Sequence, residues 1–387
     1  MTVKDERIAL SPPALAGAAV ALLLMGALTA AYGPLLSYLM RRFDVGLSIA
    51  ALVFAAHFAG ALLGVVVAMR AAARLRGRIL VGGALGLLAV GSAAVAVAPS
   101  WRFLLAAVTV IGLGFGGLDL SINQLLAYSV HPTKVALLNG VNGVYGVGAV
   151  AAPLLVSGAG ACYPVLFAGT AAIAVAALLG VQGISGGLKT PPSGDGTREP
   201  RRSNLVTTFA IAFALYVGTE VGIAGWMPTH LQSLGFASST AATLTSGFWL
   251  ALALGRFLVA PLSLRVPAPT IVLAGTAAAV VALVAALVPM AAPIAYITTG
   301  LAVAPIFPTG LAWLAALNPG YPRATSWLFP ASMLGGTLIP TAIGVAIARV
   351  GAGWVPAILA AVAFSSLAAF AAASRSGVVK PSHRRGA

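Results

Sequence analysis

Two acidic side chains stand out because they lie inside long apolar stretches of the sequence. Asp119 falls within residues 101–129 and Glu220 within residues 204–231, whereas the other acids fall outside such stretches. A carboxylate at the centre of a bilayer costs about 2.5–3.5 kcal/mol on insertion scales. We therefore expect both acids to face a wet cavity, where they take up protons or contact a substrate. The alternative is a structural hydrogen bond between helices.

Amide and aromatic side chains accompany the two acids at helical spacing. Asn123 follows Asp119 by four residues and Tyr216 precedes Glu220 by four, so each pair shares one helix face. Amides both donate and accept hydrogen bonds, which suits hydroxyl groups, and aromatic rings can stack on the C–H face of a sugar. We therefore predict a neutral, polyhydroxylated solute, with an interhelical hydrogen bond as the alternative role of each Asn. The predicted substrate-binding residues are Asn123, Gln124, Asn139, Asn142, Tyr145, Tyr32, Tyr216, Trp226, Trp249 and Phe307.

Two further ionisable residues in apolar stretches allow more than one interpretation. Arg256, near the end of residues 240–264, either binds an anionic substrate or extends toward the cytoplasm and holds a loop. His57, within residues 46–69, either relays protons or packs between helices with a hydrogen bond. We expect the structural role for Arg256 and leave both roles open for His57.

The composition places these residues in a membrane protein. Of 387 residues, 60% are hydrophobic and only 7% are charged, and the mean hydropathy is +1.02. A soluble domain is about one quarter charged, so this chain has too few charges to cover a surface in water. The chain has 22 Lys and Arg against 7 Asp and Glu. This excess is not a nucleic-acid signal, because most of the basic residues lie between the predicted spans on one side of the membrane.

About twelve stretches are long enough to cross a bilayer as helices, which takes roughly 20 apolar residues. The predicted spans are 14–40, 46–69, 79–98, 101–129, 135–158, 161–184, 204–231, 240–264, 269–289, 291–317, 322–349 and 353–373. With the N-terminus in the cytoplasm, the cytoplasmic segments hold 17 basic residues and the opposite segments hold 4. The positive-inside rule therefore predicts a multi-pass protein of the inner (plasma) membrane with both termini cytoplasmic.

A polar interruption divides the chain into two halves. Residues 186–203 are predicted to form a flexible cytoplasmic linker. The expected organisation is an N-terminal six-helix bundle (1–185), the linker (186–203), a C-terminal six-helix bundle (204–373) and a cytoplasmic tail (374–387). The fold class is therefore all-α and integral to the membrane, with twelve transmembrane helices in two six-helix halves.

Weak internal symmetry supports parallel repeats. Gly148 and Pro153 recur as Gly335 and Pro340 at an offset of 187, and a Gly-Leu pair at 112–113 recurs at 300–301 at an offset of 188. This register pairs Tyr32 with Glu220 and Asp119 with Phe307, so that the polar residues differ between the halves.

Enzyme motifs are either absent from the sequence or in the wrong context. Gly112, Gly114 and Gly117 match the spacing of a dinucleotide fingerprint, but they lie inside a predicted span with no preceding strand. We interpret them as packing glycines. The single cysteine, Cys162, excludes a cysteine-based metal cluster.

Three stretches resemble the fucose/glucose–galactose/hexose proton symporter branch of the major facilitator superfamily. GGLDLSINQLL (116–126) resembles that branch's fourth helix, in which an acid is followed four residues later by Asn. YVGTEVGIAGWMPTHL (216–231) and TSGFWLALALGRFL (245–258) resemble its seventh and eighth helices. The third stretch joins GLAVAPIFPTGLAW (300–313) to MLGGTLIP (333–340), and looser similarity covers nearly the whole chain.

The resemblance implies the twelve-helix fold of that superfamily, alternating access and proton-coupled sugar uptake. It places the family's fourth-helix carboxylate on Asp119, its Asn on Asn123 and its seventh-helix Glu on Glu220. The fucose symporters also carry an acid in the first helix, where this chain has Tyr32 and no acid. The loop at 74–78 likewise lacks the superfamily's usual Asp. These departures weigh against fucose as the substrate and against the usual charge latch between the halves.

We therefore predict a secondary active transporter and not an enzyme. The expected activity is proton-coupled symport of a neutral sugar or similar polar solute by alternating access. The alternative is a proton-coupled antiporter that exports drugs or amphipathic metabolites. We expect no cofactor or metal; H⁺ is the expected coupling ion, and Na⁺ stays open because a carboxylate with nearby amide oxygens also suits it. The expected partners are a small-molecule substrate and membrane lipid, not nucleic acid, and the expected functional unit is a monomer.

Overall fold

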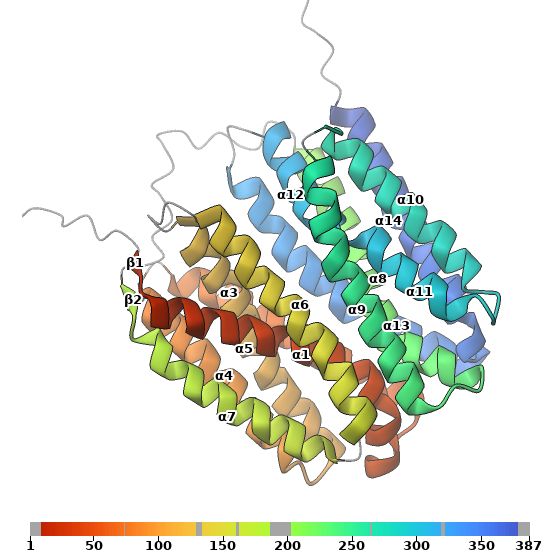
Figure 1. Ribbon diagram of the computed structural model, residues 1–387, viewed down its shortest axis with the longest axis horizontal. Helices are drawn as coiled ribbons and strands as arrows, with labels where there is room; N and C mark the ends of the chain where they lie inside the picture. The colour runs from red at the N-terminus through yellow and green to blue at the C-terminus, as the bar shows by residue number, and fades with distance from the viewer. Residues whose placement is uncertain are drawn as a thin grey trace, which may run out of the picture.

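A computed structural model describes residues 9–72, 74–128, 134–159, 162–185, 203–263, 265–318 and 322–377. Its helices lie side by side in two bundles, one from each half of the chain (Figure 1). The first bundle contains α1 (Pro12–Phe43), α2 (Leu47–Ala50), α3 (Leu52–Ala71), α4 (Gly77–Ala96), α5 (Trp101–Tyr128), α6 (Lys134–Ala159) and α7 (Tyr163–Val181). The second contains α8 (Ser203–Ser233), α9 (Ser238–Leu262), α10 (Ala268–Ala285), α11 (Ala292–Val303), α12 (Ile306–Leu317), α13 (Leu328–Val350) and α14 (Val355–Gly377).

The helices make twelve membrane crossings. Within the described residues, 11 segments are long and apolar enough to span a bilayer, and a shorter apolar stretch of α6, Gly143–Gly158, supplies one more. Two of the crossings are each built from a pair of helices, α2 with α3 and α11 with α12. Helices suit this environment because they satisfy the backbone hydrogen bonds internally. The predicted all-α fold of twelve transmembrane helices in two halves is confirmed.

Short elements other than α-helices add detail that the sequence did not predict. A two-residue strand β1 (Ala9–Leu10) pairs antiparallel with β2 (Ile184–Ser185) and ties the start of α1 to the end of α7. Two 3-10 helices, Pro322–Trp327 and Ala352–Trp354, precede α13 and α14. The predicted linker falls almost wholly outside the described residues, so the exact bounds of the halves stay a prediction.

The tenth crossing is broken, whereas the sequence predicted one continuous span over 291–317. The helix is interrupted at Ala304 and Pro305, between α11 and α12. Pro305 and Pro308 lack backbone N–H groups, so the carbonyl oxygens of Leu301 and Ala304 lose their usual helical donors. Discontinuous helices in transporters border the substrate site, which makes this break relevant to function.

Close helix contacts through glycine repeat between the two halves. A Cβ atom on Gly148 would overlap the carbonyl oxygen of Leu23, and one on Gly335 would overlap that of Ala214. The glycines are related by the predicted offset of 187 (335 − 148), but their partners on the first helix of each half are related by 191 (214 − 23).

A second pair of contacts shows nearly the same two offsets. A Cβ on Gly112 would overlap the carbonyl oxygen of His57, and one on Gly300 would meet that of Phe248. The glycines differ by 188 (300 − 112) and their partners by 191 (248 − 57). The chain between the second and fourth crossings is therefore three residues longer in the first half than in the second.

This difference corrects one prediction from the sequence. Glu220 corresponds to Thr29 (220 − 191) and not to Tyr32, because the first helix of each half follows the offset of 191. Asp119 still corresponds to Phe307, since the fourth helix keeps the offset of 188.

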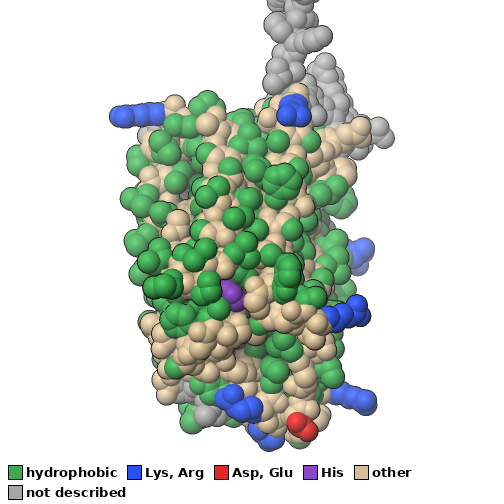
Figure 2. All heavy atoms as spheres, turned by 90° about the vertical axis from the view of Figure 1, so that its right-hand side faces the viewer, with side chains coloured by type: hydrophobic (Ala, Val, Ile, Leu, Met, Phe, Trp, Pro, Cys, Tyr) green, Lys and Arg blue, Asp and Glu red, His purple; other side chains and the backbone are tan. Residues whose placement is uncertain are grey.

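The outer surface of the bundles is apolar, as a lipid-facing surface must be. Hydrophobic side chains cover most of the face in Figure 2, and Lys and Arg side chains lie mainly toward its two ends and one edge. Among the exposed large side chains are Leu179 at 80%, Val165 at 70% and Phe257 at 64%. These exposures are appropriate in lipid and would be costly in water.

Candidate functional site

The two membrane-embedded acids lie on opposite halves of the molecule. Asp119 belongs to α5 and Glu220 to α8, and both side chains are half-buried. The Nδ2 atom of Asn123 donates to Asp119 Oδ1 at 3.1 Å and to the Asp119 carbonyl oxygen at 2.8 Å. The hydroxyl of Tyr216 donates to Glu220 Oε2. Both pairs expected from helical spacing therefore form.

Tyr145 of α6 lies within electrostatic reach of both acids. Its side chain is beside Thr29 of α1, near enough for a hydrogen bond, and interacts electrostatically with Glu220, Arg256 and Asp119. Arg256 of α9 in turn interacts electrostatically with Glu220. Residues from five helices and both halves thus surround one space.

We refer to Asp119, Tyr145, Tyr216, Glu220 and Arg256 as the central cluster. All except Tyr216 are half-buried, so space for solvent borders them in the middle of the bundles. A charged group that faced lipid would be strongly disfavoured, so this space lies between the helices.

The described contacts of Arg256 point toward the acids and not to a loop, so its expected role as a loop anchor stays a prediction. Its Nε atom is buried and has no hydrogen-bond partner, and its charge interacts with Glu220 and Tyr216. An arginine extended toward the cytoplasm would instead place its guanidinium in water. The sequence showed a basic residue near the end of a span, but not the side toward which it points.

Phe307 contributes an aromatic wall next to the break in the tenth crossing. Its ring lies 5.4 Å from that of Phe213 and 6.1 Å from that of Phe329, measured between centroids. The side chain is half-buried, in contrast to the buried Phe213. This position is compatible with the predicted substrate contact, which stays a prediction.

Three other predicted substrate contacts are packed inside the protein. Tyr32 is buried, with its hydroxyl 3.1 Å from Nδ1 of His57. Trp226 is buried and its Nε1 donates to the Pro340 carbonyl oxygen at 2.8 Å. Trp249 is buried beside Phe248. In this conformation these three residues fix helix packing, so their substrate role stays a prediction.

The remaining predicted residues have less structural detail. Gln124 is half-buried, one residue after Asn123. Asn139 and Asn142 belong to α6, but their side chains lie outside the described residues. No group of three or more His, Cys, Asp or Glu able to hold a metal occurs within the part of the chain that the structure describes.

One end of the space between the halves is closed. We call the side on which α1 begins and α14 ends the terminal side, and the opposite side the far side. On the far side, a Cβ on Gly33 of α1 would overlap the carbonyl oxygen of Ala224 of α8. Ala51, which precedes α3, contacts Gly344 of α13 in the same region.

A second interface between the halves joins α6 to α9. The hydroxyl of Ser246 donates to the Val150 carbonyl oxygen at 2.8 Å, and a Cβ on Gly146 would lie 3.2 Å from the Cβ of Ala253. Because the far side is closed while the central cluster still has exposed surface, the described residues leave the terminal side as the side of access to the cluster.

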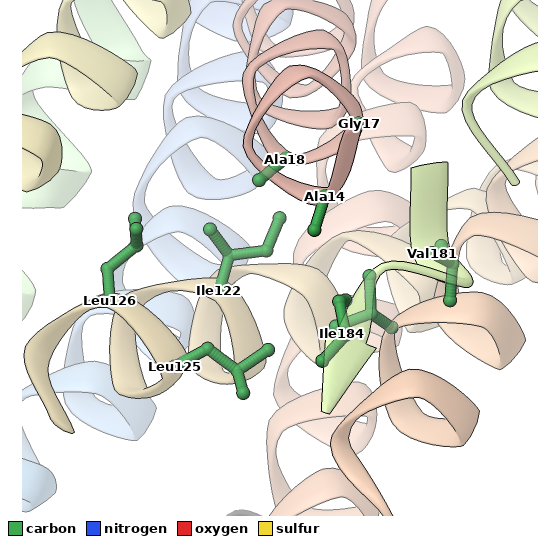
Figure 3. A pocket seen from close by; sticks show the side chains of 9 residues that line it. Ala14, Gly17, Ala18, Ile122, Leu125, Leu126, Val181 and Ile184 are labelled. Atoms are coloured by element: carbon green, nitrogen blue, oxygen red, sulfur yellow. The ribbon is translucent and has the colours of Figure 1, made fainter. Parts of the chain in front are cut away.

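A separate hollow near the terminal side is too small to be the site. It lies among α1, α4, α5, α7 and β2, with Ala14, Ile122 and Ile184 among its apolar lining residues (Figure 3). Its cavity volume is about 10 Å³, which is room for about one water molecule. We therefore assign the functional site to the central cluster.

Two symmetric helical bundles around charged, half-buried residues define a membrane transporter. The sequence profile described as Major Facilitator Superfamily matches residues 18–298, and the chain belongs to this family. It is accordingly a transporter and not an enzyme. None of the curated proteins compared with the chain matches its sequence.

Solved structures of several transporters share this fold. A D-xylose–proton symporter matches with a TM-score of 0.75 and 12% identity over 92% of this chain and 96% of its own. The nucleoside transporter NupG matches with a TM-score of 0.72 and 13% identity, over 95% and 99%. A peptide transporter, POT, solved with sulfate, matches with a TM-score of 0.76 and 14% identity, over 93% and 93%. At such identities the likeness establishes the fold alone, and the sugar-symporter branch is not singled out.

Proposed function

We propose that the protein is a proton-coupled symporter of a small hydroxyl-bearing solute, with a sugar as the expected class. The observation that carries this proposal is the position of two membrane-embedded acids, Asp119 and Glu220, on opposite halves around Tyr145. Acids at the interface of the two halves can couple the binding of a proton to the relative movement of the halves. The D-xylose–proton symporter among the structural neighbours is consistent with this assignment.

The mechanism follows from the cost of enclosing charge. An ionised carboxylate in a closed, dry cavity is unfavourable, so a protonated acid lets the halves close around the solute. The solute shifts the equilibrium between conformations only through the contacts that it gains on closure. In this proposal, Asn123 and Tyr145 supply the hydrogen bonds to the hydroxyl groups of the solute. The proton and the solute then leave together on the other side.

The setting of this activity is part of the proposal. The distribution of 17 basic residues against 4 supports the inner membrane with both termini cytoplasmic. In that orientation, the terminal side is cytoplasmic and the structure is the inward-facing state. H⁺ is the proposed coupling ion, with Na⁺ as the alternative, and the monomer is the proposed unit because one chain holds the whole cluster.

Proteoliposomes with a pH-sensitive dye inside test the proposal. A panel of hexoses, pentoses and sugar acids is added outside, and internal acidification is recorded. Symport predicts acidification with one class of sugar and its loss in Asp119→Asn. If neither H⁺ nor Na⁺ accompanies any of these solutes into liposomes, sugar symport is wrong.

Export of amphipathic compounds in exchange for protons is the second candidate. The half-buried rings of Phe307 and Phe329, which pack with the buried Phe213, favour it, because such rings also bind apolar solutes. This candidate predicts that a lipophilic cation placed inside the liposomes draws protons inward as it leaves. It also predicts that Asn123→Ala retains activity, whereas sugar symport predicts its loss.

A further inference from the structure

Arg256 carries a guanidinium group inside a membrane span, and its interaction with Glu220 acts at a distance, without a close ion pair among the described residues. Its Nε atom is buried and unpaired, and it forms no ion pair within 4.0 Å with Asp119 or Glu220. The carboxylate of Glu220 instead accepts a hydrogen bond from Tyr216. A guanidinium carries five N–H donors, and the buried Nε–H of Arg256 is costly to leave without an acceptor in a low-dielectric site. The position thus calls for an anion from outside the chain.

The same arginine borders the space assigned to the solute. It interacts electrostatically with Glu220, Tyr216 and Tyr145. The preceding residue, Gly255, packs against the broken tenth crossing, since its Cβ would lie 3.1 Å from the Leu301 carbonyl oxygen. Arg256 therefore belongs to the central cluster and also lies beside the discontinuous helix.

The charges of the cluster favour one class of solute. When Asp119 and Glu220 both carry protons, Arg256 leaves one positive charge in the space. A neutral sugar would leave that charge uncompensated when the halves close, at a large desolvation cost. A carboxylate on the solute would neutralise it.

We propose that Arg256 binds the carboxylate of the solute, so that the transported substrate is a sugar acid taken up with two protons. A guanidinium and a carboxylate form two parallel, charge-assisted hydrogen bonds, which also orient the solute. The hydroxyl groups of the solute then face Asn123 and Tyr145. The inference rests on the proposed symport function and narrows its substrate class from sugars to hydroxylated carboxylates.

The test compares matched acidic and neutral sugars on the full-length protein in proteoliposomes. Glucuronate, galacturonate and gluconate are compared with glucose and galactose, with labelled-solute uptake and internal pH recorded together. We expect uptake of an acid at least tenfold above that of its neutral counterpart, and two protons per molecule. Arg256→Gln should lower acid uptake at least tenfold, and Arg256→Lys should restore part of it. Arg265→Gln, which removes an exposed positive charge, should leave uptake unchanged.

Separate outcomes distinguish the inference from the proposed function. If a neutral hexose drives proton entry as well as its acid, and Arg256→Gln leaves their ratio unchanged, the carboxylate inference is wrong while symport stands. If no sugar of either kind moves protons or Na⁺, sugar symport itself is wrong and the inference falls with it.

A binding measurement covers the case in which Arg256→Gln does not fold. The melting temperature of the unmodified protein is measured with each acid and its neutral counterpart. A rise with an acid alone supports the inference, and a rise with neutral hexoses alone contradicts it.

Discussion

The two membrane-embedded acids differ in their immediate partners. Asp119 accepts a hydrogen bond from an amide, and Glu220 accepts one from a phenol. Glu220 also lies within the electrostatic reach of Arg256, so Asp119 is the acid without arginine among its closest interactions. We therefore expect Asp119 to be the acid whose charge most needs a proton before the halves close.

Replacement of Asp119 by Asn tests this role. The amide mimics a permanently protonated acid, so net uptake driven by a pH gradient should fall at least tenfold while solute exchange at equal concentrations continues. Both are measured in proteoliposomes with the labelled solute. Asp44→Asn is the control, because Asp44 is an exposed acid that follows α1. Uptake by Asp119→Asn at the level of the Asp44→Asn protein would contradict the assignment.

The buried pair of Tyr32 and His57 provides a prediction on stability. Nε2 of His57 already lacks a partner, and Tyr32→Phe would also remove the partner of Nδ1. An unpaired buried polar group costs about 1–3 kcal/mol, so the melting temperature should fall by a few degrees. Tyr38→Phe is the control, because Tyr38 is only half-buried and packs under Arg41. Equal melting temperatures for the two variants would mean that the Tyr32–His57 hydrogen bond contributes little.

Contacts within one helix were predictable from the sequence, and contacts between helices were not. The pairs of Asp119 with Asn123 and of Tyr216 with Glu220 follow from the helical period alone. The correspondence of Thr29 in the first half with Glu220 in the second depends on an offset of 191 between the first helices, which the sequence repeats at 187 and 188 did not reveal. The direction of Arg256 depends in the same way on packing.

At the scale of the elements, glycines determine how closely the helices approach. A Cβ on Gly116 of α5 would overlap the carbonyl oxygen of Ala61 of α3, and one on Gly64 would overlap that of Leu113. Gly112, Gly114 and Gly117 also contact neighbouring helices, as expected of packing glycines. Close backbone approach of this kind stabilises helix pairs in membranes.

Two alanine substitutions separate packing glycines from unconstrained ones. Gly116→Ala should force α3 and α5 apart, which costs about 1–3 kcal/mol as overpacking, and lower the melting temperature. Gly86→Ala should be neutral or stabilising, because a Cβ at Gly86 meets nothing within 4 Å and Ala favours a helix by about 1 kcal/mol. The melting temperatures of the purified variants are compared with that of the unmodified protein. An unchanged melting temperature for Gly116→Ala would contradict the packing argument.

Helix positions were largely predictable, because the apolar stretches are long and bounded by polar or Gly and Pro residues. The break between α11 and α12 was missed, although its cause is visible in the sequence as Pro305 and Pro308. Proline inside an apolar run is compatible with either a continuous or a broken helix. Only the surrounding packing decides between them.

At the scale of the whole molecule, the described residues close the far side and leave the central cluster accessible from the terminal side. Alternating access requires the reverse state as well, in which the far side opens. Gly33 lies at the closed contact, where a Cβ would overlap the Ala224 carbonyl oxygen. A side chain at this position should therefore act as a wedge between α1 and α8.

Spin labels on both sides can measure the effect of this wedge. In a Cys162→Ser background, one pair of cysteines replaces Arg42 and Met290 on the far side. A second pair replaces Arg70 and Arg265 on the terminal side. All four of these residues are exposed and each pair joins the two halves, so the labels report the separation of the halves without disturbing their packing.

Gly33→Ala should shift the population toward the state that is open on the far side. The far-side distance should lengthen and the terminal-side distance should shorten in the same sample, because two rigid halves that rock about the central cluster cannot open on one side without closing on the other. Gly46→Ala is the matched control, since Gly46 lies in the far-side loop after α1 with nothing within 4 Å of its Cβ position. Lengthening on the far side without shortening on the terminal side would indicate local unpacking of α1 instead of rocking. No change in either distance would mean that the Gly33 contact does not control closure.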